Sequence, residues 1–167
     1  MRRIVRNPAT AAALQRLEEK RDRELAELFV PERPGDRPPR LPEDITELDD
    51  RQLMMLFREL TEWSVYFAGQ LARAKVDELF AEAKYELLRA DALAERVTKS
   101  VTEAKALADS NPEVKAAKQE LVNAKANRIR AETSQASTER LAAFCSRELT
   151  RRSEAADRVD RSYRWTA

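Results

Sequence analysis

The sequence contains no histidine and only one cysteine, Cys145. Histidine is the side chain most often used as a general base and as a metal ligand near neutral pH, so its absence removes the commonest forms of both. A lone cysteine cannot form a disulfide within the chain, which favours a reducing compartment such as the cytoplasm. We therefore expect neither a disulfide scaffold nor a histidine-based catalytic centre.

Glycine is nearly as scarce, with only Gly35 and Gly69 in 167 residues. These two lie too far apart to form a glycine-rich loop around a phosphate. No other catalytic or metal-binding arrangement is recognisable, so we expect a binding protein with no enzymatic activity, cofactor or metal ion. No run of apolar residues approaches the ~20 that a membrane span requires, so we expect no membrane partner.

Aromatic residues make up only 6% of the chain, and much of its 43% apolar content is alanine. Charged residues reach 37%, and alanine, leucine, glutamate, lysine and arginine dominate, which is typical of long helices and coiled coils. The 31 basic and 30 acidic residues leave a net charge of +1. A polyanionic partner would therefore have to bind a local group of basic residues.

Prolines divide the chain into segments. A helical run over about residues 10–29 forms an N-terminal helical arm, assigned to residues 1–30. Five prolines and Gly35 then fall in the linker 31–46, where no helix can persist. We expect this linker to be mobile and dispensable for the fold.

A long helix is predicted to begin at Thr46, because Asp49 follows three residues later as in a capping box. Helical periodicity then continues to about Ala108, and only Gly69 interrupts it. The alternative is a helix broken near Gly69 into two packed pieces.

The sequence Asp109-Ser110-Asn111-Pro112 is a second stop signal, after which a final helix is predicted to reach about Val159. Because this stop is short, the two long helices should form an antiparallel hairpin over residues 47–160, followed by a tail at 161–167. The predicted fold is all-α: a long antiparallel helical hairpin or coiled coil with an N-terminal helical arm, assembled into an oligomer.

Residues at alternating spacings of three and four form a coiled-coil seam in both predicted long helices. In the first helix the seam residues are Leu53, Leu56, Leu60, Trp63 and Phe67, followed by Phe80, Ala83, Leu87, Ala90, Ala94, Val97, Val101 and Ala104. In the last helix they are Val114, Ala117, Leu121, Ala124, Arg128, Ala131, Gln135, Thr138, Ala142, Cys145 and Leu149. Alanine at many of these positions would let the backbones approach closely.

Between Leu53 and Phe67, at the start of the first long helix, apolar side chains form a cluster that is broader than one partner helix can cover. A small bundle within the chain and an interface between copies both explain it. We favour the interface, because the rest of the chain supplies few large apolar residues to cover the cluster. The predicted oligomer-interface residues are Leu53, Leu56, Leu60, Trp63 and Phe67.

Basic residues and a tyrosine share one face of the first long helix. Lysine and arginine can follow a phosphate backbone, and tyrosine can stack on an unpaired base. The predicted DNA-binding residues are Lys84, Tyr85, Arg89, Arg96 and Lys99. Two further basic groups occur later in the chain: Lys118, Lys125 and Arg128, and then Arg147, Arg151 and Arg152. The opposing interpretation is a solvated face, since Glu95 and Lys99 form an ordinary i,i+4 pair.

The segment Leu141-Ala142-Ala143-Phe144-Cys145-Ser146, followed by Glu148-Leu149 and a basic helix, resembles the C-terminal helix of the UvsY-type recombination mediators of tailed phages. The long helix after Trp63, including Ala83-Lys84-Tyr85-Glu86-Leu87-Leu88-Arg89, is also similar to that family. The general pattern covers residues 50–160, whereas the N-terminal arm and the linker have no counterpart.

This resemblance implies a small helical homo-oligomer in the host cytoplasm. Such a protein binds single-stranded DNA, displaces or remodels the single-strand binding protein, and loads a RecA-like recombinase. By the same resemblance, Lys84 and Arg89 lie nearest to the basic residues through which the family contacts DNA. The competing hypothesis is a coiled-coil structural, scaffolding or assembly protein that acts by self-association alone, which the near-zero net charge favours.

Overall fold

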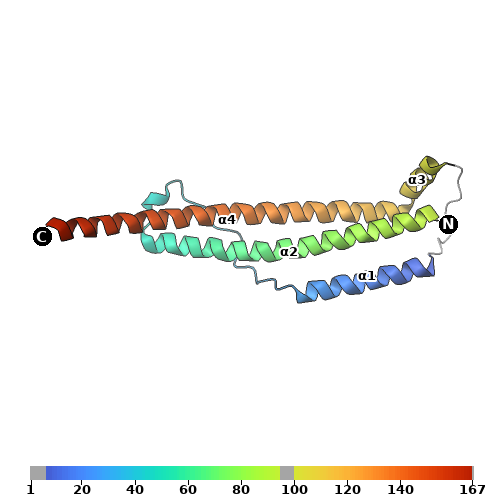
Figure 1. The fold of residues 1–167 in the computed structure, drawn as a ribbon, viewed down its shortest axis with the longest axis horizontal. Coiled ribbons are helices and arrows are strands. Elements are labelled where there is room, and N and C mark those ends of the chain that lie inside the picture. Colours follow the sequence, from blue (N-terminus) through green and yellow to red (C-terminus); the bar gives the residue numbers. More distant parts are fainter. Residues whose placement is uncertain (1–6, 95–99, 167) are drawn as a thin grey trace. The chain divides into compact units, whose positions relative to one another are not determined.

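The computed structural model describes residues 7–94 and 100–166, with side chains described up to residue 158. Within these ranges the chain is helical and has no β-strand (Figure 1). The elements are α1 (Pro8–Glu27), the 3-10 turn η1 (Ile45–Glu47), α2 (Asp50–Ala94), α3 (Val101–Ser110) and α4 (Pro112–Thr166). The predicted all-α class is confirmed, and α2 and α4 are the two long helices.

α2 begins with a reciprocal cap that differs from the predicted one. The Asp49 carboxylate accepts a hydrogen bond from the backbone N–H of Gln52 (2.7 Å), and the Gln52 side chain accepts one from the N–H of Asp49 (3.0 Å). Thr46 lies instead in η1, where the Asp44 side chain accepts from its backbone N–H (2.8 Å). The predicted capping box was therefore placed three residues too early.

α2 passes through Gly69 as predicted, but the predicted helix to Ala108 is wrong. α2 is described to Ala94, and α3 starts separately at Val101 after Ser100, whose backbone is extended (φ −128°, ψ 127°). No proline or glycine marks this break. Ser100 stands at the N-cap of α3, a position at which serine is favoured.

The second stop lies where the sequence predicts it. The backbone N–H of Asn111 donates to the carbonyl of Ala108 (3.0 Å), and the Asn111 side chain accepts from the N–H of Glu113 (2.9 Å). Pro112 then occupies the first turn of α4. At its other end α4 reaches Thr166, so the helix continues past the predicted end near Val159 and into the segment assigned to the tail.

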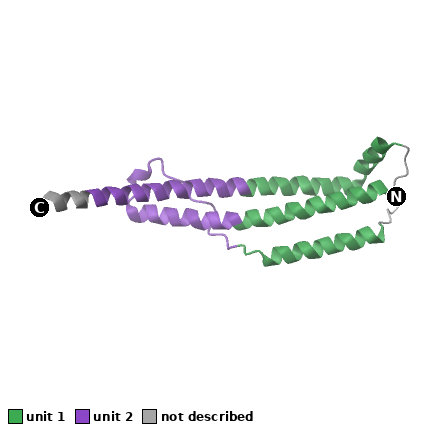
Figure 2. Cartoon of the chain, in the orientation of Figure 1, with its two compact units in different colours: residues 1–30, 69–131 green, residues 31–68, 132–167 purple. Residues whose placement is uncertain are grey.

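The structure consists of two compact units, and each unit contains one piece of α2 and one piece of α4 (Figure 2). Unit 1 consists of residues 1–30 and 69–131, and unit 2 consists of residues 31–68 and 132–167. In unit 1, Glu78 pairs with Arg128 and Glu82 with Lys125, so the two helix pieces run antiparallel.

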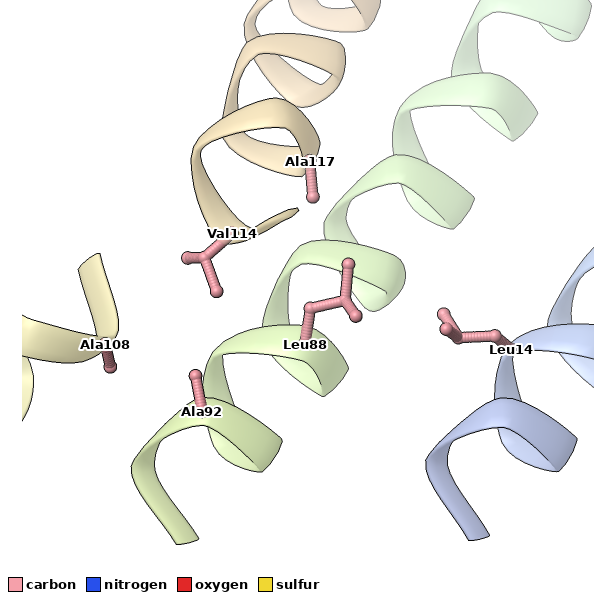
Figure 3. Packing of buried hydrophobic residues seen from close by; sticks show 6 residues of the cluster. All are labelled: Leu14, Leu88, Ala92, Ala108, Val114 and Ala117. Carbon is pink, nitrogen blue, oxygen red and sulfur yellow. The ribbon is translucent and has the colours of Figure 1, made fainter. Parts of the chain in front are cut away.

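Four helices contribute to the core of unit 1 (Figure 3). The buried residues are Leu14 from α1, Leu88 and Ala92 from α2, Ala108 from α3, and Val114 and Ala117 from α4. The predicted seam of α2 fits Phe80, which is buried, and Ala83 and Leu87, which are half-buried. After Leu87 the buried face shifts, because Leu88 and Ala92 are buried whereas Ala90 and Ala94 are exposed. The reason is that α2 packs against both α1 and α4, so its buried face differs from that of a two-helix seam.

The core of unit 2 is formed by α2, α4 and the proline-rich segment. Its buried residues are Ile45, Leu53, Leu60, Ala142 and Cys145. The segment 31–48 contributes Ile45 and the partly buried Leu41 and Leu48. This segment is free of α-helix, as predicted, and its packed side chains argue against the prediction that it is mobile and dispensable for the fold.

Every residue of the seam predicted for α4 is buried or half-buried. Its buried members are Val114, Ala117, Leu121, Ala124, Thr138, Ala142 and Cys145, and its half-buried members are Arg128, Ala131, Gln135 and Leu149. A spacing of three and four places all of them on one side of the helix.

Candidate nucleic-acid interface

The described part of the predicted DNA-binding stripe is engaged within unit 1. The Lys84 ammonium lies 2.6 Å from the Glu120 carboxylate, and the Arg89 guanidinium lies 2.9 Å from Asp109. The hydrogen bond to Asp109 also raises the pKa of Arg89. Tyr85 is half-buried and packs against the core of unit 1. Lys84 and Arg89 therefore join helices, and the charges of both are already matched.

Arg96 and Lys99, the other two predicted DNA-binding residues, lie outside the described residues. The structure consequently brings together only Lys84, Tyr85 and Arg89 on this face, and each of the two cations has an acidic partner on another helix.

The second basic group behaves like the first. Arg128 pairs with Glu78, and Lys125 lies 3.7 Å from Glu82. Both pairs connect α4 with α2. The Lys125–Glu82 pair is about half-exposed and contributes little to stability by itself, whereas Arg128 and Glu78 are mostly buried. Both pairs cancel the charge of their cations. Lys118 is exposed.

Within the third basic group, Arg152 has a structural role in unit 2. Its guanidinium donates to the carbonyl oxygens of Ile45 (3.3 Å), Thr46 (3.2 Å) and Leu48 (2.7 Å), and to the carboxylates of Asp50 (2.9 Å) and Glu148 (2.8 Å). Its side chain is 19% exposed. Arg152 thus ties α4 to the turn that precedes α2, and it is a poor candidate for binding another molecule.

Glu148 is the buried anion that organises this cluster. It accepts two hydrogen bonds from Arg151, both at 2.7 Å, and one from Arg152 at 2.8 Å. The hydrogen bonds from Arg151 have the largest effect and the hydrogen bond from Arg152 the next largest, and together they lower the pKa of Glu148 to about 2. Arg151 differs from Arg152 in that its side chain remains 62% exposed.

An exposed basic face remains on α4 of unit 2, and we call it the α4 arginine face. Its members are Arg140, Phe144, Arg147 and Arg151, spaced four, three and four apart. At about 100° of helix rotation per residue, they fall within an arc of roughly 60°. Arg140 and Arg147 are exposed, and neither forms an ion pair with any described residue. Phe144 is 48% exposed although it is aromatic.

Sequence reasoning had singled out Arg147 and Arg151 but had missed Arg140 and Phe144. It grouped the later arginines by adjacency and therefore joined them to Arg152. The helical spacing from residue 140 to residue 151 was the available signal, and it separates Arg152 from the other arginines.

Three of the five predicted oligomer-interface residues are buried within unit 2. Leu53 and Leu60 have no exposed surface, and Trp63 is 4% exposed. Leu56 and Phe67 are half-buried. The chain itself covers Leu53, Leu60 and Trp63, so these three side chains are not available to a second copy, whereas the assignment of Leu56 and Phe67 to an interface stays a prediction. The large apolar residues that are exposed are Phe29, Met54, Met55, Val65, Leu79, Val101, Val122, Ile129 and Phe144.

Cys145 adjoins the arginine face but points into the core. Its side chain is fully buried, and this burial raises the pKa of the thiol, so little of the reactive thiolate forms at neutral pH. Among the described residues no group of three or more histidine, cysteine, aspartate or glutamate side chains is placed to hold a metal ion. None of the described helices is both long enough and apolar enough to cross a membrane.

Comparison with known proteins gives no relative from which a function could be transferred: no family model, no curated protein and no solved structure matches the chain.

Proposed function

We propose that this chain is a recombination mediator that binds single-stranded DNA as a homo-oligomer and helps to load a RecA-like recombinase. In this proposal it acts by binding alone, together with the single-strand binding protein, in the cytoplasm of the host cell. Two features support the proposal: the resemblance around Phe144-Cys145-Ser146 and the distribution of positive charge on the helices.

The observation that carries the proposal is that the cations are divided between two roles. In unit 1, Lys84, Arg89, Lys125 and Arg128 pair with carboxylates of neighbouring helices. Exposed cations occur in both units, but on α4 of unit 2 Arg140 and Arg147 share a face with the exposed Phe144, within and beside the segment that carries the resemblance. A chain with a net charge of +1 can therefore still offer a locally basic surface to phosphates.

Self-association would strengthen such a surface. Val122 and Ile129 are exposed on α4 seven residues apart, and Leu79 is exposed on the piece of α2 in the same unit. These side chains are available for contact with a second copy, unlike the buried Leu53 and Leu60. Several weakly binding faces joined in one oligomer bind a long strand much more tightly than one face does.

The proposal is tested by measuring binding of the full chain to a fluorescent single-stranded oligonucleotide across a salt titration. Binding should weaken as salt rises, because the protein displaces counterions from the phosphates. It should also favour single strands over a duplex of equal length, because stacking needs unpaired bases. If no binding occurs even in low salt while light scattering shows an oligomer, the scaffold hypothesis replaces the mediator hypothesis.

A further inference from the structure

We infer that the α4 arginine face, and not the predicted stripe on α2, is the surface that binds single-stranded nucleic acid. The inference rests on the proposed function and adds to it the location of the interface, the groups that it recognises and the role of an aromatic side chain. The ligand chemistry is a chain of phosphates with at least one unstacked base.

The arrangement of the three arginines fits a phosphate backbone. Arg140, Arg147 and Arg151 lie along one side of a single helix, so their guanidinium groups follow a line and are not gathered at one point. Arginine donates in a planar fork that matches phosphate oxygens. A linear set of donors on a rigid helix suits an extended polyanion better than it suits a single small anion.

Phe144 makes an unpaired base the favoured partner. Phe144 lies between Arg140 and Arg147 along this face of the helix, and the residue is 48% exposed. An aromatic ring among cations can stack on a base while the cations hold the adjacent phosphates. An acidic peptide would use the arginines equally well but would gain much less from an exposed ring, and duplex DNA would not present an unstacked base.

Arg151 can bind a phosphate without disrupting unit 2. Its partner Glu148 also receives a hydrogen bond from Arg152 at 2.8 Å. If Arg151 turned toward a phosphate, Glu148 would keep Arg152 as its partner and would not become an unpaired buried anion. Arg152 cannot make the same exchange without releasing the backbone carbonyls before α2.

The charge test compares two double variants of the full chain. Arg140→Ala with Arg147→Ala removes two cations of the face, and Arg16→Ala with Arg23→Ala removes two exposed arginines of α1 at the same spacing of seven. The first variant should lower affinity roughly 10- to 100-fold at about 50 mM salt and reduce the salt slope by about 1.4, at about 0.7 per lost phosphate contact. The second variant should bind like the parent.

The stacking test uses Phe144→Ala, with Phe144→Trp as the rescue and Phe29→Ala as the matched control. Phe29 is the other strongly exposed phenylalanine, at 83%. Phe144→Ala should lower affinity about tenfold without changing the salt slope, since stacking displaces no counterion. Phe144→Trp should restore the affinity, and Phe29→Ala should have no effect. Circular dichroism on every variant checks that helix content is retained.

The outcomes separate this inference from the proposed function. If the parent does not bind, the proposed function fails. If the parent binds and the Arg140/Arg147 variant binds equally well at every salt concentration, the function stands and this location is wrong. If Lys84→Ala with Arg89→Ala causes the loss instead, the interface is the α2 stripe. If an acidic peptide displaces the strand from the parent and Phe144→Ala has no effect, the face recognises acidic protein.

Discussion

Arg151 and Arg152 are adjacent and chemically identical, yet the structure gives them opposite roles. One helical step of about 100° turns Arg152 toward the backbone carbonyls before α2 and leaves Arg151 largely in solvent. Helical spacing places the two residues on different faces, but the sequence could not show which of them binds the backbone before α2. That depends on where the chain segment 45–50 lies, and no local pattern specifies it.

Glu148 gives a prediction of pH dependence. Its pKa is about 2 in the folded protein, against an ordinary value of 4.5. A carboxyl whose pKa is lower in the folded state contributes stability above the unfolded pKa and loses it as the pH falls through the folded pKa. We therefore expect the urea midpoint of the parent to fall between pH 4.5 and about pH 2.

The matched control is Glu148→Gln, which removes the titrating group but keeps a polar side chain of similar size. This variant should be less stable than the parent at pH 7, since two arginines lose their anion. The difference between the two proteins should shrink across the same pH window. An equal difference at pH 7 and pH 3 would mean that Glu148 does not carry the effect.

At the scale of elements, the sequence predicted the helices better than it predicted their contacts. The sequence was sufficient to predict the helix start at Asn111 and Pro112, because it depends on local chemistry, and the buried side of α4, because it depends on helical spacing. The end of α2 was not readable, since no proline or glycine marks it. The proline-rich segment was correctly predicted to be non-helical, but prolines do not reveal that Leu41, Ile45 and Leu48 pack onto a core.

Truncation tests the role of that segment. Deleting residues 1–30 removes α1, which buries only Thr10 and Leu14, and should lower the melting temperature modestly. Deleting residues 1–48 also removes Ile45 from the core and the carbonyl partners of Arg152, so the second deletion should cost much more stability. The comparison is made by thermal circular dichroism. Equal melting temperatures for the two truncated chains would show that the segment 31–48 is only a linker.

At the scale of the whole molecule, nearly equal numbers of acidic and basic residues favoured the scaffold hypothesis and restricted any polyanion to a local group of basic residues. The structure shows why this balance is a poor guide: Glu120, Asp109 and Glu78 pair with cations on neighbouring helices, whereas Arg140 and Arg147 stay exposed. A count of charges cannot distinguish these two arrangements. The site on α4 therefore follows from the packing and was only partly visible in the sequence.

The substitution Leu60→Ala tests whether Leu60 stabilises the fold of one chain or the interface between copies. Because Leu60 is fully buried in unit 2, this change should lower the free energy of unfolding by about 2–5 kcal/mol. Light scattering well below the melting temperature should still give a mass above the 19.1 kDa of one chain. The control Val65→Ala alters an exposed residue of the same helix piece and should cost far less. If Leu60→Ala dissociates the oligomer without loss of stability, Leu60 is an interface residue after all.

The most direct measurement is photochemical crosslinking of the full chain to a single strand that carries 4-thiothymidine, followed by trypsin and mass spectrometry. The two candidate aromatic residues fall in different tryptic peptides, Tyr85 in residues 85–89 and Phe144 in residues 141–147. We predict that the crosslinked nucleotide appears on the peptide 141–147, because Phe144 lies on the exposed α4 arginine face. Crosslinks confined to the peptide 85–89 would contradict the account.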